Sequence, residues 1–479
     1  MRRAVLAVAA ALLVAGPTAL AFFSGGYFTQ PRLIAAIVAW LLVLALTSSG
    51  AEPLPRTVAG RLAVGGLALL TAWTAVSIAW APQGGPAVES AQRLALYLGA
   101  LIAAVGVLRA DWARRAVEPA LAGGATLVIG YGMAGRLLPG ILDLARSQSA
   151  DGRLEQPITY WNAEGALAAV GLILCARLVG DTTRPRAMRA AAAAAAPLLG
   201  AGVYLSYSRG AIAVALLGLA ILVAAAGSRD QLWASAVALI SGASAAAGAA
   251  AFPGVAALEG SHPERDGAAV LLLVSVITAA SAFVALRAAS RRRHDDALPW
   301  ARRFAPAAAL VVAVAVGLVV AGLSERPSAQ ELAAGAGAGR LTTTSSNRYE
   351  YWRVGLDAAE QHPLRGLGAG GFRVFWSRER SISEPVRDAH SLEIEIIAEL
   401  GLVGLAAFLL MVGGVVAASA RALRHASGAA AGPMAAALAW FLHASIDWDW
   451  QLPAVTLPAI VVAGALIVLA ERSFSRGAG

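Results

Sequence analysis

The sequence contains few charged residues, one cysteine and no lysine. Charged residues make up 14% of the 479 residues and hydrophobic residues 58%, and the mean hydropathy is +0.67. That balance lies outside the range of soluble domains and within that of proteins that cross a membrane several times. The single cysteine, Cys175, excludes a disulfide within the chain.

Motifs for nucleotides and metals are also lacking. The glycine-rich run 335–339 follows no predicted strand and has no Gly-Lys-Ser or Gly-Lys-Thr ending, so it does not indicate a phosphate-binding loop. No histidine, cysteine or carboxylate spacing indicates a metal site. We therefore expect neither a cofactor nor a metal. All 38 basic residues are arginine, and they lie between apolar segments, so the net charge of +9 does not predict a nucleic-acid partner.

Long apolar segments fill most of the chain. Because a helix crosses the hydrocarbon core with about 20 residues, we predict one all-α, polytopic membrane bundle with about 14 transmembrane helices (~12–14). The first segment follows Arg2 and Arg3 and also resembles a cleavable signal peptide, but we expect it to be retained. The predicted segments are residues 5–23, 33–47, 62–78, 94–107, 116–138, 165–179, 190–207, 211–226, 232–252, 268–286, 305–323, 396–418, 434–446 and 454–469.

The arginines indicate the orientation of these helices. With the N-terminus inside, 22 arginines fall in interior loops and six in exterior loops outside one large block. This asymmetry follows the positive-inside rule. We therefore predict a plasma (inner) membrane protein with both termini in the cytoplasm.

The large block is the only long polar segment, and it divides the chain into three parts. Residues 1–323 form the first part of the bundle, 324–395 a large exterior loop with amphipathic helices, and 396–479 the last transmembrane helices. The exterior has no supply of nucleotides, so a sugar or lipid donor used there must arrive already activated.

A tight exterior turn, residues 206–210, joins two apolar segments and carries Tyr207, Ser208 and Arg209. An arginine at a membrane interface can be only an anchor. Here Arg209 precedes a helix, whose free N–H groups favour an anion. The turn is therefore a candidate phosphate-binding corner.

The exterior loop begins with a predicted amphipathic helix at 346–361, for which Asn347 is the expected N-cap. Arg348 and Arg353 lie on this helix, as solvated surface residues or as ligands of an anion. Glycines between 366 and 371 predict a flexible turn. The apolar positions at helical spacing are Tyr349, Trp352, Leu356 and Ala359.

Two histidines stand near carboxylates. His390 follows Asp388 and precedes Glu393, where it is either a structural hydrogen-bonding group or a general base. His443 and Asp447 share a helix face and form either an interhelical hydrogen bond or part of a site. Asn162, at the start of another segment, either caps its helix or reaches into a polar cavity, and we expect the cap.

In this order, the motifs resemble those of the O-antigen ligase and polymerase superfamily. The resemblance spans residues 152–404. It rests on residues 152–153, 161–162, 208–210, Asn347, Arg348, Trp352, 363–368, 389–391 and 399–404.

The resemblance implies a GT-C-like fold and the transfer of a glycan from undecaprenyl pyrophosphate to a glycan, lipid or protein acceptor at the membrane, without a metal. Arg209 and Arg348, with Arg353, would bind the pyrophosphate, and His390 would assist the attacking hydroxyl. Tyr207, Ser208, Asn162, Asp388, Glu393, His443 and Asp447 are the candidate supporting residues. A polymerase, a transporter or flippase, and a non-catalytic assembly partner remain alternatives.

Overall fold

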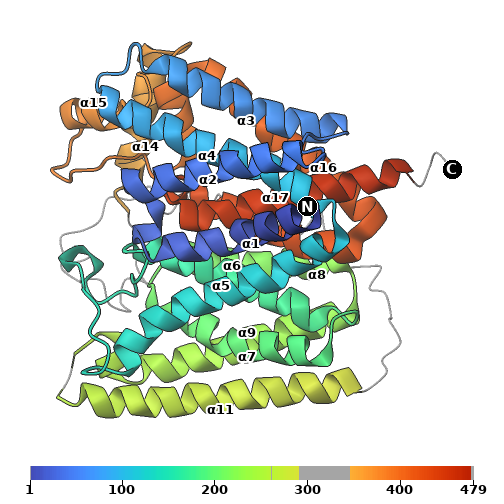
Figure 1. Ribbon diagram of the computed structural model, residues 1–479. Helices are drawn as coiled ribbons and strands as arrows, with labels where there is room; N and C mark the ends of the chain where they lie inside the picture. The colour runs from blue at the N-terminus through green and yellow to red at the C-terminus, as the bar shows by residue number, and fades with distance from the viewer. Residues whose placement is uncertain (1, 260, 291–345, 476–479) are drawn as a thin grey trace.

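A computed structural model describes residues 2–259, 261–290 and 346–475. Every regular element in these ranges is a helix (Figure 1). Eleven of these helices are long and apolar enough to cross a membrane. The prediction of an all-α, multi-pass membrane protein is therefore confirmed. The longer elements before the large loop are α1 (Arg2–Ala21), α2 (Thr29–Ser48), α3 (Val58–Ser77), α4 (Gly84–Leu108), α5 (Asp111–Leu137), α6 (Trp161–Gly180), α7 (Arg186–Leu205), α8 (Arg209–Ala226), α9 (Arg229–Ala250) and α11 (Pro263–Ser290).

The remaining helices include those of the predicted exterior loop. They are α14 (Arg348–Gln361), α15 (Phe372–Glu379), α16 (Leu392–Ala444) and α17 (Pro453–Ser475), with short helices α10 (Pro253–Ala256), η1 (Ser24–Gly26), η2 (Gln148–Ala150) and η4 (Asp449–Gln451). Each predicted segment overlaps a helix, except 305–323, which lies outside the described residues. Segment 116–138 corresponds to α5, which is not among the eleven.

Helix α16 is a pair of antiparallel helices rather than one rod. Its backbone leaves the helical conformation at Gly401 (φ 64, ψ −163) and at Ala426 (φ −148, ψ 48). Ser445, just after its end, donates a hydrogen bond of 2.8 Å to Glu393 near its start. The chain therefore turns back near Ala426, and the predicted segments 396–418 and 434–446 are its two arms.

Helices α4, α6 and α17 form the interior of the bundle, whereas α11 lies at its periphery (Figure 1). Small residues let neighbouring helices approach closely. A Cβ atom added to Gly66 of α3 would lie 2.4 Å from the backbone nitrogen of Met411 in α16. One added to Gly200 of α7 would lie 2.3 Å from the Cα of Gly242 in α9. The alanine- and glycine-rich composition thus allows this close packing.

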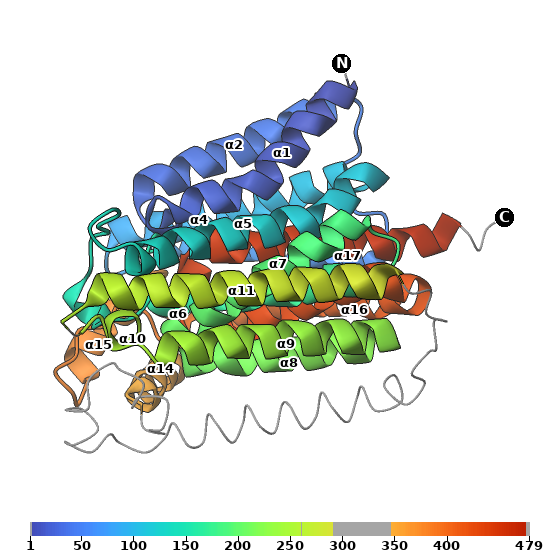
Figure 2. The same cartoon turned by 90° about the horizontal axis from the view of Figure 1, so that it is seen from below.

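Helices α14 and α15 lie at one end of the bundle, and the first residue of α1 and the last of α17 lie at the other (Figure 2). We call residues 346–391 the lid, and the end of the bundle that carries it the lid end. The lid has a small core of its own, formed by Tyr351, Val354, Phe372, Trp376 and Ala389.

One prediction about the lid is wrong. Asn347 precedes α14, but its side chain does not cap the helix and instead donates to Glu384 at 2.6 Å. Helix α14 buries Tyr351 and Val354 in the lid core, whereas Tyr349 and Leu356, two of the predicted apolar positions, are about half exposed. The amphipathic character of this helix stays a prediction.

Candidate functional site

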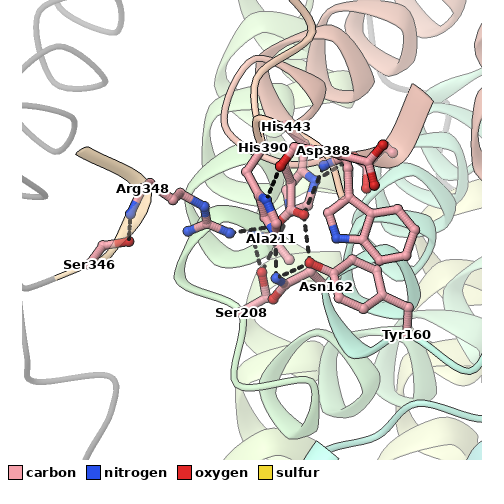
Figure 3. A network of polar contacts seen from close by, with 12 residues as sticks. Tyr160, Asn162, Ser208, Ala211, Ser346, Arg348, Asp388, His390 and His443 are labelled. Atoms are coloured by element: carbon pink, nitrogen blue, oxygen red, sulfur yellow. Dashed lines mark hydrogen bonds and ion pairs between the residues drawn. The ribbon is translucent and has the colours of Figure 1, made fainter. Parts of the chain in front are cut away.

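The lid end gathers polar side chains from distant parts of the sequence (Figure 3). The connection between α16 and α17 supplies two carboxylates. Helices α6, α8 and α14 begin near these carboxylates, and each contributes side chains from its first turn or from the residue just before it. The residues brought together are Tyr160, Asn162, Ser208, Arg348, His390, His443, Asp447 and Asp449.

Asp447 is the centre of this network, and it is almost fully buried. One carboxylate oxygen accepts from the Tyr160 hydroxyl at 2.6 Å. The other accepts from the Asn162 amide at 2.7 Å and from the Arg348 guanidinium at 2.5 Å. Burial raises the pKa of Asp447, but Arg348 and the nearby histidines outweigh burial and hold it below its ordinary value. Asp447 is therefore a carboxylate at neutral pH.

Arg348 joins the lid to the bundle through this ion pair. It is the first residue of α14, and its side chain is 19% exposed. Its Nε is buried and has no hydrogen-bond partner in the described part of the chain. Asp447 thus fixes one side of the guanidinium, and the planar fork retains donors for a further anion.

A second buried pair lies beside the first. The His443 Nδ1 and an Asp449 carboxylate oxygen are 2.5 Å apart, and the His443 Nε2 lies 3.5 Å from the Ser208 hydroxyl. Ser208 caps α8 by accepting from the Ala211 backbone N–H, so its hydroxyl proton is available to the imidazole. Burial raises the pKa of the Asp449 carboxyl, although His443 opposes this. This pairing orients the imidazole of His443.

His390 lies where the lid returns to the bundle, in a left-handed conformation with φ 53. Its Nδ1 is 3.0 Å from the main-chain oxygen of Asp388. A carbonyl can only accept, so Nδ1 carries the proton and Nε2 keeps a lone pair. Burial lowers the pKa of His390, and Arg348 adds to this effect while Asp447 opposes it. His390 is thus neutral at pH 7 and able to accept a proton.

Arg209 is the first residue of α8 and is half-buried beside Ser208. Tyr207 is in a left-handed conformation with φ 47, and its hydroxyl donates to the Ala256 carbonyl at 2.8 Å. Tyr207 therefore fixes the turn against α10, and its hydroxyl lies away from the network around Asp447.

Other candidate residues lie apart from this network. Arg353 is held by Glu350 and Asp357 on α14, at 2.7 Å each, and its side chain is 39% exposed. Glu393 accepts from Ser445 and Ser391, and this ties the two ends of α16 together. Asp388 contacts His390 through its carbonyl rather than its carboxylate.

The prediction that Asn162 caps α6 is wrong, because its amide reaches across to Asp447 and to the Tyr160 hydroxyl. Sequence reasoning missed Tyr160 and Asp449. It also missed Trp448, whose ring lies 4.3 Å from that of Tyr160 and 6.4 Å from that of His390. The alternation of acidic and aromatic residues at 447–450, directly after an apolar segment, was the available signal.

Comparison with known proteins supports the resemblance. The family described as O-antigen ligase matches residues 265–409, from the start of α11 into α16. This range includes the lid with Arg348 and His390. No curated protein matches the chain. The match supports a ligase- or polymerase-like glycan transferase of polysaccharide biosynthesis. The predicted resemblance to the O-antigen ligase superfamily is thereby confirmed.

Proposed function

We propose that the protein transfers a glycan from an undecaprenyl-pyrophosphate carrier to an acceptor hydroxyl at the exterior face of the plasma membrane. The observation that carries this proposal is the Arg348–Asp447 pair beside a neutral His390. In this proposal Arg348 is a preorganised cation and His390 a proton acceptor, both at the lid end of the bundle. Arg209, on the neighbouring turn, would add a second guanidinium to the pyrophosphate.

In the proposed reaction the bond between the sugar C1 and the pyrophosphate oxygen breaks, and a new bond forms between C1 and the acceptor oxygen. The acceptor proton passes to His390, and undecaprenyl pyrophosphate leaves with the bonding electron pair. The leaving group gains negative charge, and fixed guanidinium groups can stabilise it without a metal. A positioned base typically contributes about 10²–10⁴-fold to such a transfer.

The position of Asp447 supports this reading over a transporter or flippase. Transporters place their key polar groups near the middle of the bilayer, often on interrupted helices. Here Asp447 and His443 lie at the end of α16. Asp447 contacts Arg348 of the lid, and His443 lies near Ser208 of the α7–α8 turn.

A carrier-lipid profile of a deletion strain tests this function. We expect carrier-linked glycan to accumulate in the deletion strain. Accumulation of full-length polymer indicates a ligase, and accumulation of single repeat units indicates a polymerase. An unchanged carrier-linked pool would contradict the proposal. Complementation with His390→Ala should fail, whereas complementation with Arg265→Ala, an exposed arginine of α11, should succeed.

A further inference from the structure

Residues 363–371 form a compact turn that the proposed chemistry does not use. The sequence predicts a flexible turn here, but the backbone is bonded to the kink of α16. The Leu367 N–H donates to the Ala398 carbonyl at 3.0 Å, and the Gly368 N–H donates to the Glu399 carbonyl at 2.8 Å. The prediction of flexibility is therefore wrong, because tertiary hydrogen bonds fix the segment.

Glu399 holds the far side of this turn. Its buried carboxylate accepts from the Gly370 N–H at 2.7 Å and from the Phe372 N–H at 3.1 Å, and so caps the start of α15. Gly366 has φ +67, and an added Cβ would lie 2.3 Å from the Glu399 carbonyl carbon. The glycines thus permit a close backbone approach that no other residue type could make.

This turn is the floor of an open cleft with a volume of about 350 Å³. The cleft lies between the α3–α4 connection and the helices α14 and α15. It combines two aromatic rings, three side chains that are cationic or can become so, and one carboxylate. The residues that define it are Trp80, His362, Arg365, Phe375, Arg378 and Glu379.

Two observations indicate a ligand for this cleft. The guanidinium carbon of Arg365 lies 5.8 Å from the Trp80 ring centroid, so a cation stands beside an aromatic face. The Trp80 indole N–H is buried, and no residue in the described ranges accepts its hydrogen bond. Arg365 and Arg378 are exposed and take part in no salt bridge among those residues.

We propose that this cleft binds an acidic segment of the glycan, at a distance from the reacting end. A sugar ring has an apolar C–H face that fits an aromatic ring, while its hydroxyls suit the polar wall. A carboxylate or phosphate on the sugar would pair with Arg365 and Arg378. The 14 residues of α14, from Arg348 to Gln361, span about 20 Å of helix, so the cleft would hold the chain several sugars from the pyrophosphate.

This inference rests on the proposed function and identifies the substrate as an acidic glycan. The acidic segment could belong to the donor chain or to the acceptor chain, since both would run outward from the site. An anionic lipid headgroup is a different occupant. It would satisfy the arginines, but it would leave the aromatic wall without a matching sugar face.

Direct binding to the purified full-length protein tests the inference. The probes are a fluorescent oligogalacturonate and a malto-oligosaccharide of equal length, titrated in nanodiscs of zwitterionic lipid. We expect saturable binding of the oligogalacturonate and at least ~10-fold weaker binding of the neutral chain. The double variant Arg365→Ala/Arg378→Ala should weaken oligogalacturonate binding about tenfold or more, because hydrogen bonds to charged groups are lost. Trp80→Ala should also weaken binding, and Arg265→Ala should bind as the wild type does.

Three outcomes would overturn the inference. They are the absence of saturable oligogalacturonate binding, unchanged affinity in the double variant, or a double variant that loses only bound phosphatidylglycerol, as measured by native mass spectrometry. In a transfer assay, a raised KM for the carrier-linked glycan alone assigns the cleft to the donor, and a raised KM for the acceptor alone assigns it to the acceptor. Oligogalacturonate binding needs no transfer, so it can succeed where the proposed transfer fails, and the two failures are distinguishable.

Discussion

Asp447→Asn is the most informative single substitution, because Asp447 positions Arg348. The carboxylate accepts from Arg348, Tyr160 and Asn162 at 2.5, 2.6 and 2.7 Å. An asparagine keeps one acceptor oxygen, which the Tyr160 hydroxyl can still use, but it turns an amide N–H₂ towards the remaining donors. A hydrogen bond to a charged group contributes about 1.5–3 kcal/mol. We therefore expect a loss of about 2–3 kcal/mol of transition-state stabilisation, or roughly 30- to 150-fold in kcat/KM.

A double-mutant cycle separates positioning from general damage to the fold. The kcat/KM of purified wild type, Asp447→Asn, Arg348→Ala and the double variant would be compared in the transfer assay. If Asp447 acts through Arg348, the double variant should be little worse than Arg348→Ala alone. Additive effects, within about 0.5 kcal/mol, would refute the reasoning. Asp357→Asn is a matched control. Asp357 and Arg353 form an exposed ion pair, and such a pair should contribute little to kcat/KM.

Three further predictions concern the same site. His390→Ala should bind the carrier-linked donor normally but turn over about 10²–10⁴-fold more slowly. Because burial lowers the pKa of His390, wild-type activity should fall only as the pH drops below about 6.5. The pH profile of the variant should lack this fall at acid pH. Arg209→Lys keeps the charge but loses the planar fork, so donor binding and transfer should both be strongly impaired, and wild-type rates in this variant would count against a bidentate contact. Treatment with EDTA should leave the transfer rate unchanged, whereas a loss that a divalent metal restores would show that the proposed mechanism is wrong.

Local signals in the sequence predict most of the fold. The length of the apolar segments predicts the helices that can cross the membrane. For example, the predicted segments 396–418 and 434–446 are the two arms of α16. Polarity marks the lid, and helical spacing places α14 between Arg348 and Gln361. These features depend on residues that are neighbours in the sequence, so one sequence is sufficient to find them.

Tertiary partners are not local, and there the predictions fail. Asn162 looks like a cap in isolation, but Asp447, distant in the sequence, competes for its amide. Arg353 looks equivalent to Arg348, yet it lies beside Glu350 and Asp357 on the same helix. The spacing of His443 and Asp447 indicates a shared helix face, but the partner of His443 is Asp449, which lies beyond the end of α16. Only the fold determines which carboxylate each cation meets.

The most direct test of the proposed function is the release of the carrier. Purified protein would be incubated with carrier-linked glycan and acceptor, and undecaprenyl pyrophosphate and the new glycosidic product would be quantified by mass spectrometry. We predict equal amounts of both products from the wild type, and a large loss of both with Arg348→Ala. Glycan that crosses or remains in the membrane still linked to its carrier, with no pyrophosphate released, would contradict the account.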